Sequence, residues 1–279
     1  MRLRRRHIST TCTFALALVV TAAAVLPLYW AVTLSLRAPF SASGLGLPVV
    51  HYKPTLENWK EELASRETRK SLLNSCLVAL GTAVIAVVLG TPAAYALARF
   101  RFRRPSNADI TVWFLSQRVL PPVATAIPLL ILMQSLRLDD TRTGLVLANV
   151  TFTLPLVVVI MRQAFLDLPT ELEEAAMVDG AGPLSIFLRI FLPLAAPSLV
   201  AAVLIVIAFT WNEFLFALMT YFINAKTIPV HMAGGADTRG PQFWFIAVRA
   251  LIAITPPVIL ALLVQRYIVR GLTFGAVKG

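Results

Sequence analysis

Cysteine, histidine and charge are scarce in this 279-residue chain, and each scarcity argues against a class of function. The cysteines, Cys12 and Cys76, both lie in apolar stretches, where a thiol acts as a small apolar side chain, so a disulfide or redox pair is unsupported. The histidines, His7, His51 and His231, are scattered and lack metal-ligand spacing. Charged residues make up only 14% of the chain, whereas a soluble domain is usually about a quarter charged.

Motifs for nucleotide chemistry and for catalysis are also missing. No G-x-x-x-x-G-K-[ST] occurs, so the chain should not bind ATP through a P-loop, and Gly44-Leu45-Gly46 lacks the third glycine of a dinucleotide site. No nucleophile–base–orienter set and no pocket-like pair of carboxylates is recognisable. No RNA- or DNA-binding motif is present. We therefore expect no cofactor bound by this chain and no nucleic-acid partner.

Apolar residues are abundant, and they gather into long runs. Hydrophobic residues make up 58% of the chain, and the mean hydropathy is +0.77. Several separate runs of about 20 residues are typical of membrane-spanning helices. The formal net charge is +11, and the basic residues lie mostly at the ends of these runs, where they would meet anionic lipid headgroups. The sequence thus predicts an all-α polytopic membrane protein in contact with lipid.

We expect six transmembrane helices, each with a proline inside it or at its entry. The first run follows four arginines, as in a signal peptide, but it is long enough to span at about 1.5 Å per residue and lacks a convincing cleavage site, so we interpret it as retained. The second run is rich in glycine and alanine, which let helices pack closely in lipid. The expected spans are residues 11–36, 71–98, 108–136, 144–165, 197–220 and 243–269, the last broken by Pro256-Pro257.

Basic residues at the span ends predict that both termini are cytoplasmic. Arg99, Arg101, Arg103 and Arg104 follow the second span and give a positive-inside signal. The polar segment at 37–70 holds six basic and four acidic residues, so its charge decides little, and we place it outside. The expected organisation is a basic cytoplasmic N-terminus at 1–10, a six-span domain at 11–270 with a cytoplasmic loop at about 166–193, and a cytoplasmic tail at 271–279.

Ionisable residues inside spans are candidates for function, because charge is costly in a bilayer. Arg118 lies in the third expected span, and Asn212 and Glu213 lie in the fifth. Arg118 either lines a translocation pathway or sits near a helix end, where it snorkels or pairs structurally. Glu213 either lines the pathway or a gate, or is solvated near the outer interface. Arg249 in the sixth span could pair with Glu213, although sequence cannot show that the two are close.

The loop at 166–193 carries signals for two helical pieces. Thr170 and Glu173 have the spacing of a capping box, and carboxylates crowd the first turn, where they complement the positive end of the helix dipole. Gly180 can take the left-handed conformation that ends a helix. Pro193 should stop the second piece. Between these signals, small side chains at Ala175 and Ala176 leave a face that another surface could approach closely.

The spacing within this loop resembles the cytoplasmic EAA loop of ABC importer permeases. Glu174-Ala175-Ala176 is followed, at the family's spacing, by Gly180, Ile190 and Leu192-Pro193. The chain as a whole is similar to the carbohydrate type of these permeases, which includes the smaller maltose permease. The other resembling positions are Asp179, Ala181, Phe187 and Pro197 in and after the loop, the Thr-Leu-Glu-Asn-Trp run ending at Trp59, the run from Ala93 to Phe100, Trp211-Asn212-Glu213-Phe214, and the ending at 265–279.

The resemblance implies a function and a set of partners. Such a permease translocates a sugar or related solute into the cytoplasm across the bacterial plasma membrane. It works with a second homologous permease, two ATPase subunits and an extracytoplasmic solute-binding protein. ATP and magnesium bind the ATPases, so this chain is not expected to be an enzyme. The residues that the resemblance assigns to ATPase coupling are Glu174, Ala175, Ala176, Asp179, Gly180, Ile190, Leu192 and Pro193.

Other functions remain open at the level of sequence. An ABC permease for a polyol or glycerol-phosphate would differ only in its solute. A secondary transporter would move its solute with an ion gradient and without an ATPase. An intramembrane enzyme would form product as a purified chain. The sequence does not name the solute.

Overall fold

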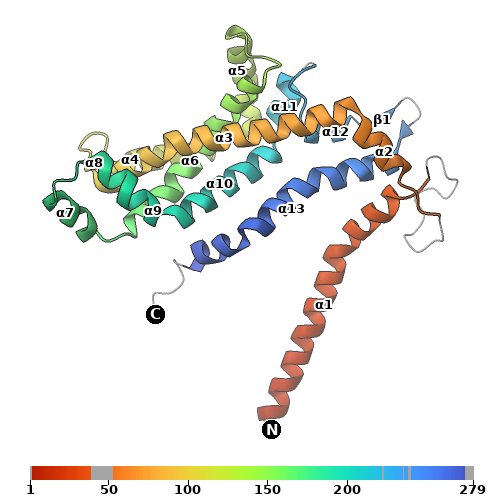
Figure 1. Cartoon of the computed structure of the whole chain (residues 1–279), viewed down its shortest axis with the longest axis horizontal. Coiled ribbons are helices and arrows are strands. Elements are labelled where there is room, and N and C mark those ends of the chain that lie inside the picture. Colours follow the sequence, from red (N-terminus) through yellow and green to blue (C-terminus); the bar gives the residue numbers. More distant parts are fainter. Residues whose placement is uncertain (1, 39–52, 222, 235, 238–239, 274–279) are drawn as a thin grey trace. The chain divides into compact units, whose positions relative to one another are not determined.

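Helices dominate the computed structural model, which describes residues 2–38, 53–221, 223–234, 236–237 and 240–273 (Figure 1). The chain divides into two compact units: unit 1 comprises Met1–Arg69 and Met232–Ile254, and unit 2 comprises Lys70–His231 and Thr255–Gly279. The elements in order are α1 (Arg2–Ser35), α2 (Glu57–Ala64), α3 (Arg66–Arg99), α4 (Asn107–Gln117), α5 (Pro122–Ser135), α6 (Arg142–Leu166), α7 (Glu171–Val178), α8 (Pro183–Ile186), the π-helix η1 (Phe187–Phe191), α9 (Leu192–Leu194), α10 (Ala196–Trp211), α11 (Leu215–Thr220), α12 (Ile228–Ala233), the two-residue strands β1 (Ala236–Asp237) and β2 (Gly240–Pro241), and α13 (Phe243–Thr273).

Six membrane spans are accounted for when bent helix pairs are counted as single spans. Four helical stretches among the described residues are long and apolar enough to cross a bilayer: Thr13–Ser35, Arg66–Arg99, Arg142–Leu166 and Phe243–Leu263. Two further spans are bent pairs, α4 with α5 at 90° and the Pro183–Leu194 stretch with α10 at 77°. The predicted all-α polytopic fold is confirmed, apart from the short β1–β2 pair. Residues 39–52 of the expected outer segment and 274–279 of the expected tail lie outside the described residues.

The bend between α4 and α5 follows from two adjacent prolines. Pro121 is extended (φ −63°, ψ 127°), because the residue before a proline avoids the helical region. Pro122 then occupies the first position of α5, where its missing N–H would have had no helical partner. Arg118 caps the C-terminal end of α4, so it lies at the interruption of this span.

The expectation that Pro193 ends a helix is wrong. The chain instead passes through the π-helical turn η1 into α9, and the Leu192 N–H bonds to the Phe187 carbonyl, five residues back. This wider turn accommodates a residue that has no N–H of its own. The break falls two residues later, at Ala195 (φ −83°, ψ 3°), and α10 begins at Ala196 with Pro197 in its first turn.

The expected interruption of the sixth span is also wrong. The helix α13 runs without a break from Phe243 to Thr273, with Pro256 and Pro257 inside it. The second span likewise starts earlier than expected, at Arg66. Its first turn is supported by the Ser65 hydroxyl, which accepts the Thr68 N–H at 3.4 Å, so the polar residues before the apolar run are helical too.

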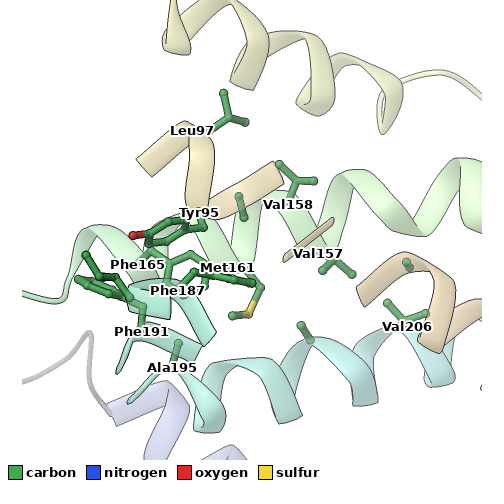
Figure 2. Close-up of a cluster of buried hydrophobic side chains, with 14 of the residues drawn as sticks. Tyr95, Leu97, Val157, Val158, Met161, Phe165, Phe187, Phe191, Ala195 and Val206 are labelled. Carbon is green, nitrogen blue, oxygen red and sulfur yellow. The ribbon is translucent and has the colours of Figure 1, made fainter. Parts of the chain in front are cut away.

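The core of unit 2 is built around Tyr95 on α3 (Figure 2). Three rings surround it, with centroid distances of 5.5 Å to Phe165 on α6, 5.0 Å to Phe187 and 5.6 Å to Phe191 on η1. Aromatic pairs at such distances contribute more than their buried area alone. The cluster therefore packs the end of the second span, the end of the fourth span and the chain after α8 against one another.

Close packing of α3 on α6 depends on two glycines. A Cβ atom at Gly90 would lie 3.0 Å from a Val157 methyl group, and one at Gly81 would lie 3.2 Å from a methyl group of Val146. Small residues let helix backbones approach in lipid, where dispersion contacts replace the hydrophobic driving force. The glycine-rich character of the second span is explained by this contact.

Unit 1 is tied together by α2. Asn58 on α2 donates through Nδ2 to the carbonyls of Ser35 (3.0 Å) and Arg37 (2.7 Å). Ser35 is the last residue of α1, and Arg37 lies two residues after it. Glu62 on α2 binds Arg249 on α13, with 2.7 Å between Oε1 and Nε, and also accepts from the Thr68 hydroxyl. Arg249 therefore pairs with Glu62, and the suggested pairing with Glu213 is replaced.

Candidate functional site

The loop between α6 and α10 begins with α7, whose N-terminus differs from the expected capping box. Thr170 is helical (φ −71°, ψ −25°), and its side chain makes no capping bond. Its carbonyl accepts the N–H groups of Glu173 (2.9 Å) and Glu174 (3.1 Å) instead. Since a capping residue must be extended to aim its side chain at the free N–H groups, the capping-box expectation is wrong.

Gly180 ends α7 as expected, in a left-handed conformation with φ +80°. The Gly180 N–H bonds to the Met177 carbonyl (3.0 Å), and the Ala181 N–H bonds to the Ala176 carbonyl (2.9 Å). These two bonds form a Schellman motif, in which the residue after the cap must have positive φ. The turn therefore fixes how α7 is presented, and glycine is the residue that adopts this conformation without strain.

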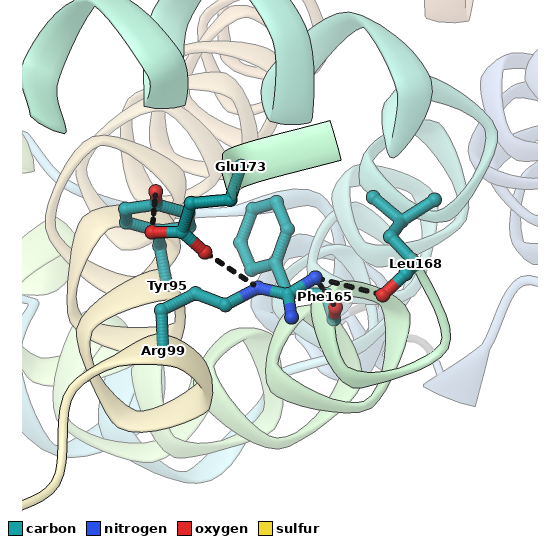
Figure 3. Close-up of polar contacts among 5 residues, drawn as sticks. All are labelled: Tyr95, Arg99, Phe165, Leu168 and Glu173. Carbon is teal, nitrogen blue, oxygen red and sulfur yellow. Dashed lines mark hydrogen bonds and ion pairs between the residues drawn. The ribbon is translucent and has the colours of Figure 1, made fainter. Parts of the chain in front are cut away.

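A single arginine ties α7 to the ends of α3 and α6 (Figure 3). Arg99 donates through Nη2 to the carbonyls of Phe165 and Leu168, at 2.8 Å each, and these carbonyls lie where α6 ends. Its Nε lies 3.6 Å from the Glu173 carboxylate on α7. The Tyr95 hydroxyl donates to the same carboxylate at 3.3 Å. The Arg99 side chain is 5% exposed and that of Glu173 is 13% exposed, so water screens this pair poorly.

The Phe191 ring connects the Arg99 side chain to the apolar core of unit 2. The guanidinium carbon of Arg99 lies 4.5 Å from the ring centroid, within cation–π distance. We name Tyr95, Arg99 and Glu173 the anchor cluster. From sequence, Arg99 was an orientation signal and part of the family-like run from Ala93 to Phe100. The four-residue spacing of Tyr95 and Arg99, which places both on one helix face, could have indicated a shared role.

The predicted coupling residues fall into an exposed set and a packed set. Exposed residues are Glu174, Ala175, Asp179, Gly180 and Pro193. Ala176 is buried in the core cluster, and Ile190 and Leu192 are half-buried and pack against it. Of the two small residues expected to leave a face open, Ala175 alone does so. Apolar side chains flank the exposed set, with Val178 87% exposed and Leu184 69% exposed.

The predicted pathway residues are also divided. Arg118 and Glu213 line one cavity of about 330 Å³, together with Asn149, Phe209 and other residues of α6, α10 and α11. Asn212 does not line it, and its side chain donates to the Ala208 carbonyl of its own helix at 2.8 Å.

Glu213 has a local structural role. Its two carboxylate oxygens accept the N–H groups of Phe216 (2.7 Å) and Ala217 (3.1 Å), which lie in the first turn of α11, where N–H groups have no helical partner. The carboxylate is thus half-buried and hydrogen-bonded. Among the described residues, no group of three or more His, Cys, Asp or Glu side chains could hold a metal ion.

Up to six spans among the described residues, a cavity lined by Arg118 and Glu213, and a loop tethered by Arg99 describe a multi-pass membrane protein. Residues 75–274 match the family described as binding-protein-dependent transport system inner membrane component, and the chain belongs to this family. It is therefore a multi-pass inner-membrane permease subunit of a carbohydrate-type ABC transporter, as the resemblance predicted.

Relatives and solved structures agree with this assignment. The chain is 38% identical over 259 residues to the trehalose transport system permease protein SugB of Mycobacterium tuberculosis, covering 92% of this chain and 93% of the relative. It is 35% identical over 257 residues to the trehalose/maltose transport system permease protein MalG of Thermococcus litoralis, covering 91% of each. A crystal structure of a bacterial ABC transporter involved in the import of alginate matches with a TM-score of 0.80 at 21% identity, covering 95% of this chain and 98% of that one. At that identity the likeness concerns the fold.

Proposed function

We propose that this permease carries a sugar across the membrane into the cytoplasm, driven by ATP, and that the loop at 166–193 couples it to the ATPase. The observation that carries the coupling role is the anchor cluster, which fixes α7 to the core while leaving Glu174 and Ala175 exposed. The sugar class rests on the relatives, whose names specify trehalose and maltose. A solute of another class, such as a polyol or glycerol-phosphate, would leave the coupling role unchanged.

The chain would work within an assembly. Its partners would be a second homologous permease, two ATPase subunits that bind ATP and magnesium, and an extracytoplasmic solute-binding protein. A crystal structure of similar fold is described as an alginate ABC transporter in complex with its periplasmic protein, which supports partners of this kind. Catalysis of ATP hydrolysis would belong to the partner ATPases.

The exposed loop residues would form the contact with the ATPase. Glu174 would make polar contacts, Ala175 would permit close approach, and Gly180 with Asp179 would present the end of α7. Val178 and Leu184 would add apolar area to the contact, since both are largely exposed. Ala176, Ile190 and Leu192 would brace the loop from inside, because they pack on the core cluster.

Movement of the ATPase would reach the spans through the anchor cluster. A displacement of α7 acts on Glu173, which is linked to Arg99 at the end of α3, and Arg99 holds the carbonyls at the end of α6. The two helices would then move as one body, switching the spans between inward and outward access. Among the predicted pathway residues, Arg118 would respond through its bond to the Phe152 carbonyl within α6, and Asn212 and Glu213 would respond at the end of α10.

The proposed orientation places α7, residues 1–10 and the tail at 271–279 in the cytoplasm. Arg99, the last residue of α3, contacts the end of α6 and α7, so the basic end of α3 lies at the same end of unit 2 as α7, which supports this side as cytoplasmic. Labelling of single cysteines introduced at Arg101 and at Asn224 with a membrane-impermeant reagent tests it. In intact cells, only the cysteine at 224 should react.

Purification of the tagged chain in mild detergent tests the assembly. We expect an ATPase and a second permease to copurify. Proteoliposomes that contain the assembly should take up labelled trehalose or maltose only with ATP on the ATPase side and with the binding protein on the other. Uptake that follows an ion gradient and survives ATP depletion would point to a secondary transporter, and product formation by the purified chain would point to an enzyme.

A further inference from the structure

We propose that the cavity of about 330 Å³ lined by Arg118 and Glu213 is a binding subsite of this chain for one ring of a neutral sugar. The inference rests on the proposed function and adds a place and a chemistry to it. The volume lies at the lower end of the roughly 300–1,000 Å³ that ligand pockets occupy. We name this hollow the polar cavity.

Two helix interruptions meet at the polar cavity. Arg118 and Leu120 come from the break between α4 and α5, and Glu213 and Phe214 come from the break between α10 and α11. Non-helical backbone at membrane depth is tolerated where it is buried in protein or lines a water-filled cavity. Two interrupted spans therefore supply the wall of one hollow, where groups outside the regular helices can meet a ligand.

Arg118 is a permanently charged group without a charged partner here. Among the described residues, no carboxylate lies within ion-pair distance of it. Its Nη1 donates to the Phe152 carbonyl at 3.1 Å, and its guanidinium carbon lies 4.9 Å from the Phe209 ring centroid. These two contacts orient the group but do not neutralise it. An exposed guanidinium on a span is costly unless it faces water or a polar ligand, so its spare N–H groups are available to solute oxygens.

The charges of the polar cavity favour a neutral ligand over an anion. Arg118 and Glu213 are the ionisable residues among those that line it, so one positive charge is accompanied by one negative charge. Glu213 is held in place by the N–H groups of Phe216 and Ala217, and in its ionised form it would oppose a carboxylate or phosphate. Hydroxyl groups, which both donate and accept, can use the guanidinium and the carboxylate together.

Aromatic rings supply the apolar part of the same wall. Phe152 and Phe216 stack with 5.0 Å between centroids, and Phe209 and Phe214 also line the polar cavity. A sugar ring has apolar C–H faces and a polar rim of hydroxyls, which matches a wall of rings with a few polar groups. By contrast, a larger cavity of about 620 Å³ is lined almost wholly by apolar side chains, with Cys76 and Ser198 as exceptions, and offers few groups to hydroxyls.

Protection of an introduced cysteine tests the subsite in the whole importer. In a Cys12→Ser, Cys76→Ala background, Phe214→Cys places a thiol on the cavity wall, and Leu218→Cys places a matched, 44% exposed thiol on α11 outside it. The assembled importer in proteoliposomes is labelled with a charged methanethiosulfonate, with and without trehalose delivered by the binding protein. We expect trehalose to slow labelling several-fold at 214 and to leave 218 unchanged.

A charge-removing variant supplies the second measurement. Arg118→Gln should raise the trehalose concentration for half-protection by about tenfold, the loss expected for one charged hydrogen bond, while Arg118→Lys should recover part of it. Arg137→Gln, an arginine outside the cavity, is the control, and copurification of the ATPase verifies assembly of each variant.

Different results would contradict the proposed transport function and the proposed sugar subsite. Absence of sugar uptake by the wild-type importer would contradict the proposed function. Normal uptake without protection at 214, or Arg118→Gln equal to its control, would overturn the subsite alone. Stronger protection by glucuronate than by trehalose would overturn the choice of a neutral ligand.

Discussion

Two regions of unit 2 are each held by one charged side chain, one by a cation that donates hydrogen bonds and the other by an anion that accepts them. At one end, the cation Arg99 donates to carbonyls at the end of α6 and faces Glu173 on α7. At the other, the anion Asp140 accepts N–H groups from the chain that follows α11. In Figure 1, α7 and α11 lie at opposite ends of α6 and α10.

The Asp140 connection is the tighter one. Its carboxylate accepts the backbone N–H groups of Ile223 (3.0 Å), Asn224 (2.8 Å) and Ala225 (2.9 Å), and the Asn224 side-chain amide at 3.1 Å. Its own N–H bonds to the Thr220 carbonyl at 2.8 Å. Since all these partners belong to one short stretch, the carboxylate holds that stretch in a single shape.

The anchor cluster instead combines short and long contacts. Arg99 holds the carbonyls of α6 at 2.8 Å, whereas Glu173 of α7 lies 3.6 Å from Arg99 and 3.3 Å from the Tyr95 hydroxyl. The strong bonds join the two spans, and the weak ones join α7 to them. This difference fits the proposed coupling, in which a displacement of α7 reaches the two joined spans through Glu173.

The largest expected effect is that of Arg99→Gln. The change leaves two carbonyls and the Glu173 carboxylate poorly satisfied in a buried place, which costs about 3 to 5 kcal/mol. We expect a lower thermal stability of the purified assembly and fewer sugars transported per ATP hydrolysed. Arg101→Gln, an exposed arginine two residues on, is the matched control. Equal behaviour of the two variants would remove the anchor cluster from the coupling path.

The next effect is that of Asp140→Ala, which tests the tighter connection. The backbone N–H groups at 223–225 lose their acceptor, and alanine replaces a residue with φ +49°, so we expect a cost of about 2 to 3 kcal/mol. Asp139→Ala is the control, since it removes a neighbouring carboxylate at an ordinary φ. Thermal unfolding should separate the two, while transport per ATP should change less than in Arg99→Gln. If Asp140→Ala reduced transport per ATP more than it reduced thermal stability, a purely structural role for Asp140 would be contradicted.

Gly180→Val comes third and acts through the backbone alone. Nothing lies within 4 Å of a Cβ at Gly180, but φ is +80°, which a β-branched residue adopts at a cost above roughly 1 kcal/mol. Gly182→Val is the control, because Gly182 is equally open and extended (φ −76°, ψ 161°). We expect Gly180→Val alone to weaken ATPase copurification and uptake. Equal binding by both variants would show that the turn does not present the contact.

The sequence predicted those features of the fold that depend on residues close together in the chain. The apolar runs and their lengths predict six spans, and Gly180 predicts the end of α7, because a left-handed residue is needed there whatever surrounds it. The effect of Pro193 was mispredicted, because the π-turn that accommodates it depends on the packing of Phe187 and Phe191.

Partners of charged residues could not be predicted for a related reason. Arg249 pairs with Glu62, which is 187 residues away in the chain, and Arg99 meets Glu173, which sequence had assigned to a cap. Both pairings follow from tertiary packing. Arg118 and Glu213 were identified as candidates by their charge within apolar runs, but their shared cavity depends on two helix breaks that meet in space.

Tyr95→Phe should have the smallest effect of these variants. It separates the contribution of the Tyr95 hydroxyl from that of the Arg99 guanidinium. The change removes the hydroxyl bond to Glu173 and keeps the ring contacts with Phe165, Phe187 and Phe191, so the cost should be about 1 kcal/mol or less. Transport per ATP should fall only slightly. In an Arg99→Gln background the same change should cost less still, because Glu173 has then lost its main tether and the hydroxyl holds a helix that is already loose. Tyr95→Phe as damaging as Arg99→Gln would mean that the hydroxyl, not the guanidinium, links α7 to the spans.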